Sequence, residues 1–136
     1  MEIRVLSNDK ENGKLSFIVK DAIPAFANTL RRIMIDEVPT MAIEDVEFIK
    51  NNSILYDEII AHRLGLIPLT TDLKSYNLPE KCKCNGEGCA RCQVKITLKA
   101  SKGSGMIYAS ELKSKDSAIK TVYPKMPIVQ LLKGQS

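Results

Sequence analysis

Four cysteines are the residues of this sequence best suited to chemistry. The spacing is Cys-x-Cys, four further residues, then Cys-x-x-Cys, and four thiolates of this kind can surround a Zn²⁺ ion tetrahedrally. Gly86 and Gly88 give the chain between the two pairs the freedom to fold back tightly. The sequence therefore predicts a structural zinc site in a loop at residues 82–92, with the ligands Cys82, Cys84, Cys89 and Cys92.

Three other uses of these cysteines stay open but are less favoured. Two disulfides would be unusual in a reducing cytosol. A redox Cys-x-x-Cys usually lies where a strand meets a helix, whereas Cys92 runs directly into a predicted strand. An iron–sulfur cluster also takes four cysteines, but this spacing matches neither common ferredoxin pattern.

The remaining ionisable residues do not form a catalytic arrangement. His62 is the single histidine, and no nucleophile stands at the spacing of a Ser/His/Asp or Cys/His constellation. A surface or interface hydrogen bond suits it better than metal, since four cysteines already fill a zinc shell. The pairs Glu44-Asp45 and Asp57-Glu58 are adjacent carboxylates that point apart, and an Asp-x-Asp cluster is absent. We predict no catalytic residue in this chain.

Composition narrows the class of protein. The chain has 136 residues, which suits one domain or two small ones, and 44% are hydrophobic. Its net charge of +4 is modest, and aromatic residues make up only 5%, so no stacking platform for nucleic acid is evident. No apolar run approaches the roughly 18 residues of a membrane span. The N-terminus lacks the apolar region of a signal peptide, so we expect a cytoplasmic location without membrane attachment.

The first forty residues predict a hairpin and a helix. Asn12-Gly13 is a strong turn signal between predicted strands Glu2–Leu6 and Lys14–Lys20. A helix is predicted over Pro24–Glu37, because proline is tolerated in the first turn and Pro39 disfavours continuation. Its apolar residues recur at helical spacing and form one stripe, made of Ile23, Phe26, Leu30, Ile33 and Met34.

The rest of the chain reads as short strands around a second helix. That helix has Asp57 and Glu58 at its start and Gly65 as a left-handed stop. Lys95, Thr97 and Lys99 alternate with apolar residues over Gln93–Ala100. A flexible turn at Ser101–Gly105 would lead into a partner strand at Met106–Ala109, and Ser110–Lys120 reads as polar and exposed. Further strands are predicted at Met41–Lys50, Leu66–Thr70 and Pro127–Leu132.

Three ordered phrases carry a resemblance to a known family. They are Asn-Thr-Leu-Arg-Arg at 28–32, Val-Pro-Thr-Met-Ala-Ile-Glu-Asp-Val at 38–46, and Asp-Glu-Ile-Ile-Ala-His-Arg-Leu-Gly-Leu-Ile-Pro-Leu at 57–69. Together they resemble the D subunits of archaeal RNA polymerase, counterparts of the N-terminal region of the bacterial alpha subunit. The resemblance runs from about Leu15 to the last residues.

This resemblance implies an α+β fold. An alpha-subunit-like dimerisation domain, a sheet with a helix, would be interrupted by an inserted, mostly-β domain with a Cys-rich loop. Residues 1–44 would be the first portion of the dimerisation domain, 45–125 the insert, and 126–136 the return. Family members normally continue with further strands and a long helix, so we expect a C-terminally truncated chain with an incomplete dimerisation domain. The family often has a zinc loop here, and this chain has one residue more between the pairs than the commonest eukaryotic spacing.

The resemblance also implies a function as a non-catalytic assembly subunit. Such a subunit pairs with the small subunit L, and the pair recruits subunits N and P and the two large catalytic subunits. Nucleotidyl transfer then belongs to the whole complex, and no sequence-specific DNA contact is expected. The predicted interface has two parts. The apolar residues assigned to the dimer or domain core are Phe26, Leu30, Ile33 and Met34. The polar residues assigned to contacts with a large subunit are Asn28, Arg31 and Arg32.

Two alternatives come from other classes of protein. An independent zinc-loop nucleic-acid binder would use Lys81, Lys83 and Arg91, although these cations are few and lack aromatic partners. A redox enzyme would use Cys89 and Cys92, but it needs a reactive thiolate that zinc would sequester.

Overall fold

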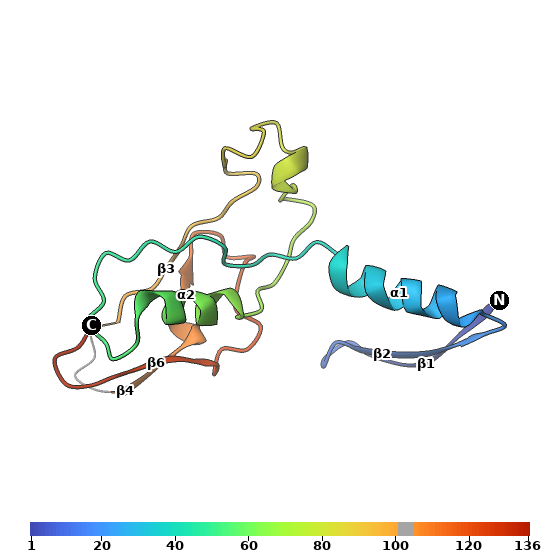
Figure 1. The fold of residues 1–136 in the computed structure, drawn as a ribbon, viewed down its shortest axis with the longest axis horizontal. Coiled ribbons are helices and arrows are strands. Elements are labelled where there is room, and N and C mark those ends of the chain that lie inside the picture. Colours follow the sequence, from blue (N-terminus) through green and yellow to red (C-terminus); the bar gives the residue numbers. More distant parts are fainter. Residues whose placement is uncertain (101–104) are drawn as a thin grey trace. The chain divides into compact units, whose positions relative to one another are not determined.

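The computed structural model describes residues 1–100 and 105–136. The chain forms two compact units that divide between Val38 and Pro39. Helices and strands occur in both units, so the predicted mixed α+β class is confirmed (Figure 1). In the described ranges, no helix has the length and apolar character needed to cross a bilayer.

The first unit opens with an antiparallel hairpin of β1 (Glu2–Asp9) and β2 (Lys14–Lys20). The Asp9 carboxylate accepts hydrogen bonds from the backbone N–H groups of Glu11 (3.1 Å) and Asn12 (3.2 Å). Gly13 follows with φ of 63°, a left-handed conformation that glycine adopts without strain. These contacts confirm the predicted hairpin, although β1 runs further than the predicted strand.

Helix α1 (Pro24–Asp36) completes this unit. The Ile23 carbonyl accepts hydrogen bonds from Phe26 N at 3.0 Å and from Ala27 N at 3.3 Å, and the second is the first i→i+4 bond of the helix. The predicted helix is confirmed except at Glu37, which is the C-cap. No residue of 1–38 is buried, so the hairpin and helix leave their apolar side chains accessible. Burial of apolar surface is the main driving force of folding, and this unit lacks a core of its own.

Within its described residues, the second unit contains helix α2 (Asp57–Gly65), two short 3₁₀ helices and four short strands. Strand β3 (Ile96–Thr97) pairs with β5 (Lys113–Ser114), and β4 (Gly105–Tyr108) pairs with β6 (Pro127–Leu131), both antiparallel. The 3₁₀ helices are η1 (Pro79–Lys81) and η2 (Ala109–Glu111). Thus residues 126–136, predicted as the return toward a dimerisation domain, carry a strand that pairs within the second unit.

The core of the second unit lies where α2 meets the β4–β6 pair. Ile107, Ile119 and Ile128 are its largest fully buried side chains, and α2 adds Ile60 and Leu64. The guanidinium of Arg63 donates to the Pro127 carbonyl at 3.1 Å and ties α2 to the start of β6. Apolar residues around strand β3 and Tyr76, which precedes the cysteine loop, pack against this core.

The end of α2 differs from the prediction. The helix stops at Gly65 as predicted, but Gly65 is not among the residues with positive φ, and the cap residue Leu66 has φ −85° and ψ −4°. A Cβ at Gly65 would lie 3.4 Å from the carbonyl oxygen of Ile43. That distance is an ordinary van der Waals contact, so the predicted left-handed stop is wrong and the space around Gly65 does not itself require glycine.

Several predicted strands were wrong in extent or partner. Met41–Lys50 contains no strand, because its apolar residues pack against the core without joining a ladder. Leu66–Thr70 makes only the single bridge Leu69–Thr121. The strand predicted at Met106–Ala109 pairs with β6 rather than with the preceding one.

Two further predictions concern the stretch around residue 110. The segment Ser110–Lys120, predicted as exposed, contributes β5 and buries Ile119 to 1% exposure. Of the predicted turn Ser101–Gly105, residues 101–104 lie outside the described ranges, and Gly105 begins β4.

Candidate metal centre

The structure brings all four cysteines together in one loop. Their sulfur atoms all lie within 4.8 Å of one another. Three separations are resolved individually: Cys82 to Cys89 at 3.5 Å, Cys84 to Cys92 at 3.5 Å, and Cys89 to Cys92 at 3.8 Å. A tetrahedral zinc site with bonds of about 2.3 Å places its sulfurs about 3.8 Å apart. The donor set therefore fits a tetrahedral ion, and all four cysteines are free thiols.

Local turns produce this convergence. Asn85 N donates to the Cys82 carbonyl and Glu87 N to the Cys84 carbonyl, each at 3.1 Å. Asn85, Gly86 and Gly88 have positive φ values of 51°, 88° and 91°. Left-handed residues reverse the chain within few bonds, so the two cysteine pairs can meet across a short loop.

The second pair forms a tight turn of its own. The carbonyl of Cys89 accepts hydrogen bonds from Cys92 N at 3.0 Å and Gln93 N at 2.9 Å. Cys89 N donates to the sulfur of Cys92 at 3.2 Å, and Arg91 N donates to the sulfur of Cys89 at 3.4 Å. Backbone N–H groups directed at sulfur stabilise the thiolate form, which is the form that binds metal.

The thiols of Cys84 and Cys92 differ widely in pKa. Hydrogen bonds from the thiols of Cys82 and Cys92, helped by the backbone N–H groups of Gly86 and Gly88, lower the pKa of Cys84 to about 6. The N–H of Cys89 acts to lower the pKa of Cys92, but burial and hydrogen bonds with the other three thiols raise it to about 12. A divalent cation would replace the thiol protons and interact with all four sulfurs at once.

Two hydrogen bonds define the base of the loop, one closing it and one joining it to the rest of the second unit. Asn77 N donates to the Arg91 carbonyl at 2.8 Å, which closes the loop. The hydroxyl of Tyr76 donates to the Asp116 carboxylate at 2.7 Å. The sequence prediction missed Tyr76 and Asp116, since no local pattern relates residues so far apart. In Figure 1 the loop that carries η1 projects from the rest of this unit.

His62 lies outside this cluster. It is exposed on α2, and it does not belong to the metal-ligand group found among the described residues.

The predicted interface residues lie on α1. Phe26, Ile33 and Met34 are 41%, 40% and 49% exposed, and Leu30 is half-buried. Two guanidinium nitrogens of Arg31 donate to the side-chain oxygen of Asn28, at 3.2 and 3.0 Å, so these polar residues form one group.

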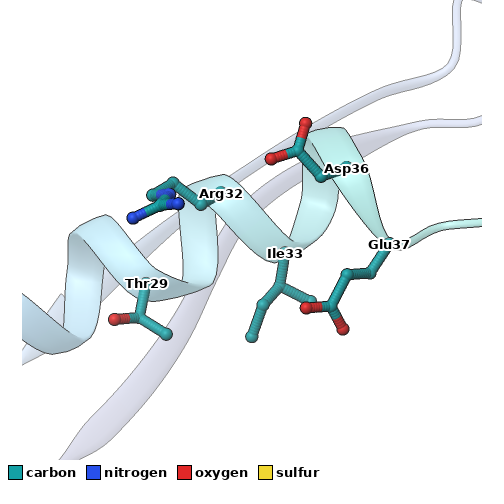
Figure 2. Close-up of a pocket in the computed structure, with 5 residues that line it drawn as sticks. All are labelled: Thr29, Arg32, Ile33, Asp36 and Glu37. Atoms are coloured by element: carbon teal, nitrogen blue, oxygen red, sulfur yellow. The ribbon is translucent and has the colours of Figure 1, made fainter.

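Arg32, the next residue of the helix, has different neighbours. It lines a shallow hollow with Thr29, Ile33, Asp36 and Glu37. Figure 2 shows Arg32 and Asp36 in one row along the helix, and Thr29, Ile33 and Glu37 in the neighbouring row.

Comparison with known proteins identifies the family. Residues 41–136 match the family described as the RNA polymerase Rpb3/RpoA insert domain. The chain belongs to this family. The match covers α2, the cysteine loop and the strands β3 to β6 that the structure describes in the second unit.

Relatives of this insert-domain chain extend the similarity to the first unit. The DNA-directed RNA polymerase subunit Rpo3 of Methanosarcina mazei is 46% identical over 136 residues, which cover 99% of this chain and 50% of the relative. The proteins of the same name from Methanosphaera stadtmanae and Pyrococcus furiosus are 44% and 41% identical, over 93% and 99% of this chain and 48% of each relative. The chain thus spans about half the length of the curated relatives it matches. The predicted likeness to an archaeal RNA polymerase subunit is confirmed.

Proposed function

We propose that this chain acts as part of a non-catalytic assembly subunit of DNA-dependent RNA polymerase, of the D type. The observation that carries the proposal is the similarity of nearly the whole chain to proteins named DNA-directed RNA polymerase subunit Rpo3. Nucleotidyl transfer would belong to the assembled complex, and this chain would make no sequence-specific DNA contact.

In this proposal, α1 contributes to a heterodimer with subunit L. The first unit buries none of its residues, so its apolar surface is available to another polypeptide. Phe26, Leu30, Ile33 and Met34 would enter the dimer or domain core, since well-packed apolar and aromatic side chains carry most of the binding energy of an interface. Asn28, Arg31 and Arg32 would make polar contacts with a large subunit. The hydrogen bonds between Arg31 and Asn28 support this role because they hold the guanidinium in one orientation.

The remaining partners and the domain arrangement follow the same proposal. The heterodimer would recruit subunits N and P and the large catalytic subunits in the cytoplasm. Residues 1–44 would be the first portion of the dimerisation domain and 45–125 the insert, with 126–136 leading back toward the dimerisation domain.

The four cysteines would hold a structural zinc ion. With Cys82, Cys84, Cys89 and Cys92 as ligands the coordination shell is closed, which leaves no position for substrate. Zinc would therefore fix the loop at 82–92 as a rigid projection of the second unit rather than supply catalysis.

Co-purification tests the assembly role. The full-length protein, tagged and co-expressed with subunit L, should yield a stable one-to-one complex. Ile33→Glu should abolish this complex because it places a charge within the apolar stripe. Ile35→Glu is the matched control: Ile35 is 67% exposed, and the residue lies about 200° around the helix from Ile33. Equal complex formation by both variants, or a full-length protein that binds no polymerase subunit, would contradict the proposal.

The nucleic-acid alternative has less support. Lys81, Lys83 and Arg91 are exposed beside the cysteines, but the segment 77–92 contains no aromatic residue on which a base could stack. Nanomolar DNA binding with a steep salt dependence would favour that alternative.

A further inference from the structure

The β3–β5 ribbon of the second unit has two chemically different faces. Burial alternates along residues 94–100, so that Val94, Ile96, Leu98 and Ala100 pack against the core. Lys95, Thr97 and Lys99 are exposed between them. Successive side chains of extended backbone point to opposite faces, so these three residues share the outward face.

The partner strand adds two more lysines to that face. Thr97 lies directly opposite Lys113 in the antiparallel pair. Lys115 N donates to the Lys95 carbonyl at 3.1 Å, which extends the ladder by one pair and sets Lys95 opposite Lys115. Directly opposed residues lie on the same face of a sheet. We call the four exposed residues Lys95, Lys99, Lys113 and Lys115 the lysine face.

Within the described part of the chain, no carboxylate forms an ion pair with the lysine face. The ion pair found in that part joins Lys20 to Glu2 in the first unit. Asp116, the acid next to Lys115, accepts hydrogen bonds from Tyr76 at 2.7 Å and from Ala118 N at 2.8 Å. These bonds direct the carboxylate toward Tyr76 and Ala118, and among the described residues it forms no ion pair with a lysine of the face. Like charges directly opposite each other on a sheet are destabilising, so the Lys95–Lys115 pair costs stability unless an anion lies over it.

We propose that the lysine face is a docking surface for an extended acidic segment of a partner protein. Alternate residues of a strand repeat every 6.6–6.8 Å or so, and carboxylates at alternate positions of an extended peptide repeat at the same distance. Such a segment could place one carboxylate over the Lys95–Lys115 pair, the next over Lys113 and a third over Lys99. This surface lies in the second unit, so the inference goes beyond the assembly role proposed for α1.

The chemistry of the face favours protein over nucleic acid. The five outward positions of the ribbon, 95, 97, 99, 113 and 115, are occupied by four lysines and one threonine, so none of them carries an aromatic ring. Binders of single-stranded nucleic acid stack bases on aromatic rings. These positions also lack arginine, the residue suited to bidentate phosphate recognition. Lysines act as point charges, which suits individual carboxylates.

Binding of a defined peptide to the whole chain tests the proposal. The probe is a fluorescent eight-residue peptide of alternating Glu and Ser, titrated at low salt and followed by anisotropy. Lys95→Ala/Lys115→Ala should weaken binding about tenfold, since each exposed ion pair contributes up to about 1 kcal/mol. Lys10→Ala/Lys14→Ala removes the same charge from the exposed hairpin of the first unit and should leave the affinity unchanged.

Three results would overturn the proposal. The first is no measurable binding of the peptide, and the second is an equal loss in both double variants. The third is tighter binding of single-stranded oligothymidylate than of the peptide with loss through the same lysines, which would make the face a nucleic-acid site. None of these results depends on α1 or subunit L, so failure here leaves the assembly proposal standing.

A second measurement checks the geometry without any ligand. Lys115→Glu puts an opposite charge across from Lys95, so the melting temperature of the chain should rise while peptide binding is lost. Lys125→Glu, at another exposed lysine of the second unit, is the matched control and should not raise it. A lower melting temperature for Lys115→Glu than for the control would contradict the opposed lysine pair and, with it, the docking surface.

Discussion

The hydroxyl of Tyr76 donates a 2.7 Å hydrogen bond to the carboxylate of Asp116. Tyr76 stands just before the cysteine loop and packs against the core of the second unit, while Asp116 follows β5. Since Asn77 N also closes the loop on the Arg91 carbonyl, this bond joins the loop base to the β3–β5 ribbon. The position of the cysteine cluster therefore depends on the protein fold as well as on any bound metal.

Removing the Tyr76 hydroxyl should destabilise the second unit. Tyr76→Phe keeps the ring and deletes one hydrogen bond, so the free energy of unfolding should fall by about 1 kcal/mol. Urea unfolding of the zinc-loaded chain measures this change. Tyr123→Phe is the matched control, because Tyr123 is 61% exposed. Equal losses in both variants would show that the bond to Asp116 contributes nothing.

Acid should weaken the same contact. The backbone N–H of Ala118, and then the Tyr76 hydroxyl, hold the pKa of Asp116 below its ordinary value of 3.8. A carboxyl with a lowered folded-state pKa stabilises the protein above its unfolded pKa, and this contribution is lost as pH falls through the folded value. Asp116→Asn should therefore flatten the loss of stability between about pH 5 and pH 2. Urea midpoints across this range test it, with the exposed Asp45→Asn as control. An unchanged acid profile for Asp116→Asn would contradict the assignment.

Local signals in the sequence were sufficient for the hairpin, both helices and the cysteine cluster. Each of these signals fixes the backbone conformation of only a few neighbouring residues. They are Asn12-Gly13, Pro24 and the glycines between the cysteine pairs. The alternation over residues 94–100 was also correct, because burial on one face of extended chain needs only a core beneath it. It held even though the hydrogen-bonded ladder is just Ile96–Thr97.

Strand partners could not be read from the sequence. Short strands of similar composition do not specify which other strand they meet, so β4 was assigned to the wrong neighbour. The segment 41–50 has the apolar content of a strand but pairs with no other strand. Its side chains pack against the core instead, namely those of Met41, Ile43, Val46 and Phe48. Ile119 is one apolar residue within a polar run, and its burial follows from long-range bonds such as Thr70 N to the Lys120 carbonyl at 2.8 Å.

Zinc binding should depend on the buried cysteine Cys92. Loss of one of four ligands opens the shell, so Cys92→Ser should weaken zinc binding more than the 10–100-fold or so typical of an outer-shell change. Metal analysis of the purified chain should give one zinc for the unaltered protein, and the cobalt-substituted form should show a tetrahedral thiolate spectrum. Lys83→Ser, between Cys82 and Cys84, is the matched control and should retain the metal. Full zinc content in Cys92→Ser would contradict the four-cysteine site.

Gly86 and Gly88 offer a matched pair that separates backbone strain from crowding in the loop. Both have positive φ, 88° and 91°, so alanine at either should cost about 1–2 kcal/mol. A Cβ at Gly88 would in addition lie 2.7 Å from Cδ of Gln93, whereas nothing lies within 4 Å of one at Gly86. The Gln93 amide is the end of a flexible, exposed side chain and can rotate away, so Gly88→Ala should cost only up to about 0.5 kcal/mol more than Gly86→Ala.

The Gln93 side chain provides the decisive control for this difference. Adding Gln93→Ala to Gly88→Ala removes the obstructing amide, so the free energy of unfolding should return to that of Gly86→Ala. Adding Gln93→Ala to Gly86→Ala should change nothing further, since a Cβ at Gly86 meets no side chain. Urea unfolding of the four zinc-loaded variants measures the coupling directly. Equal costs at both glycines, without rescue by Gln93→Ala, would mean that the loop is limited by its backbone conformation alone.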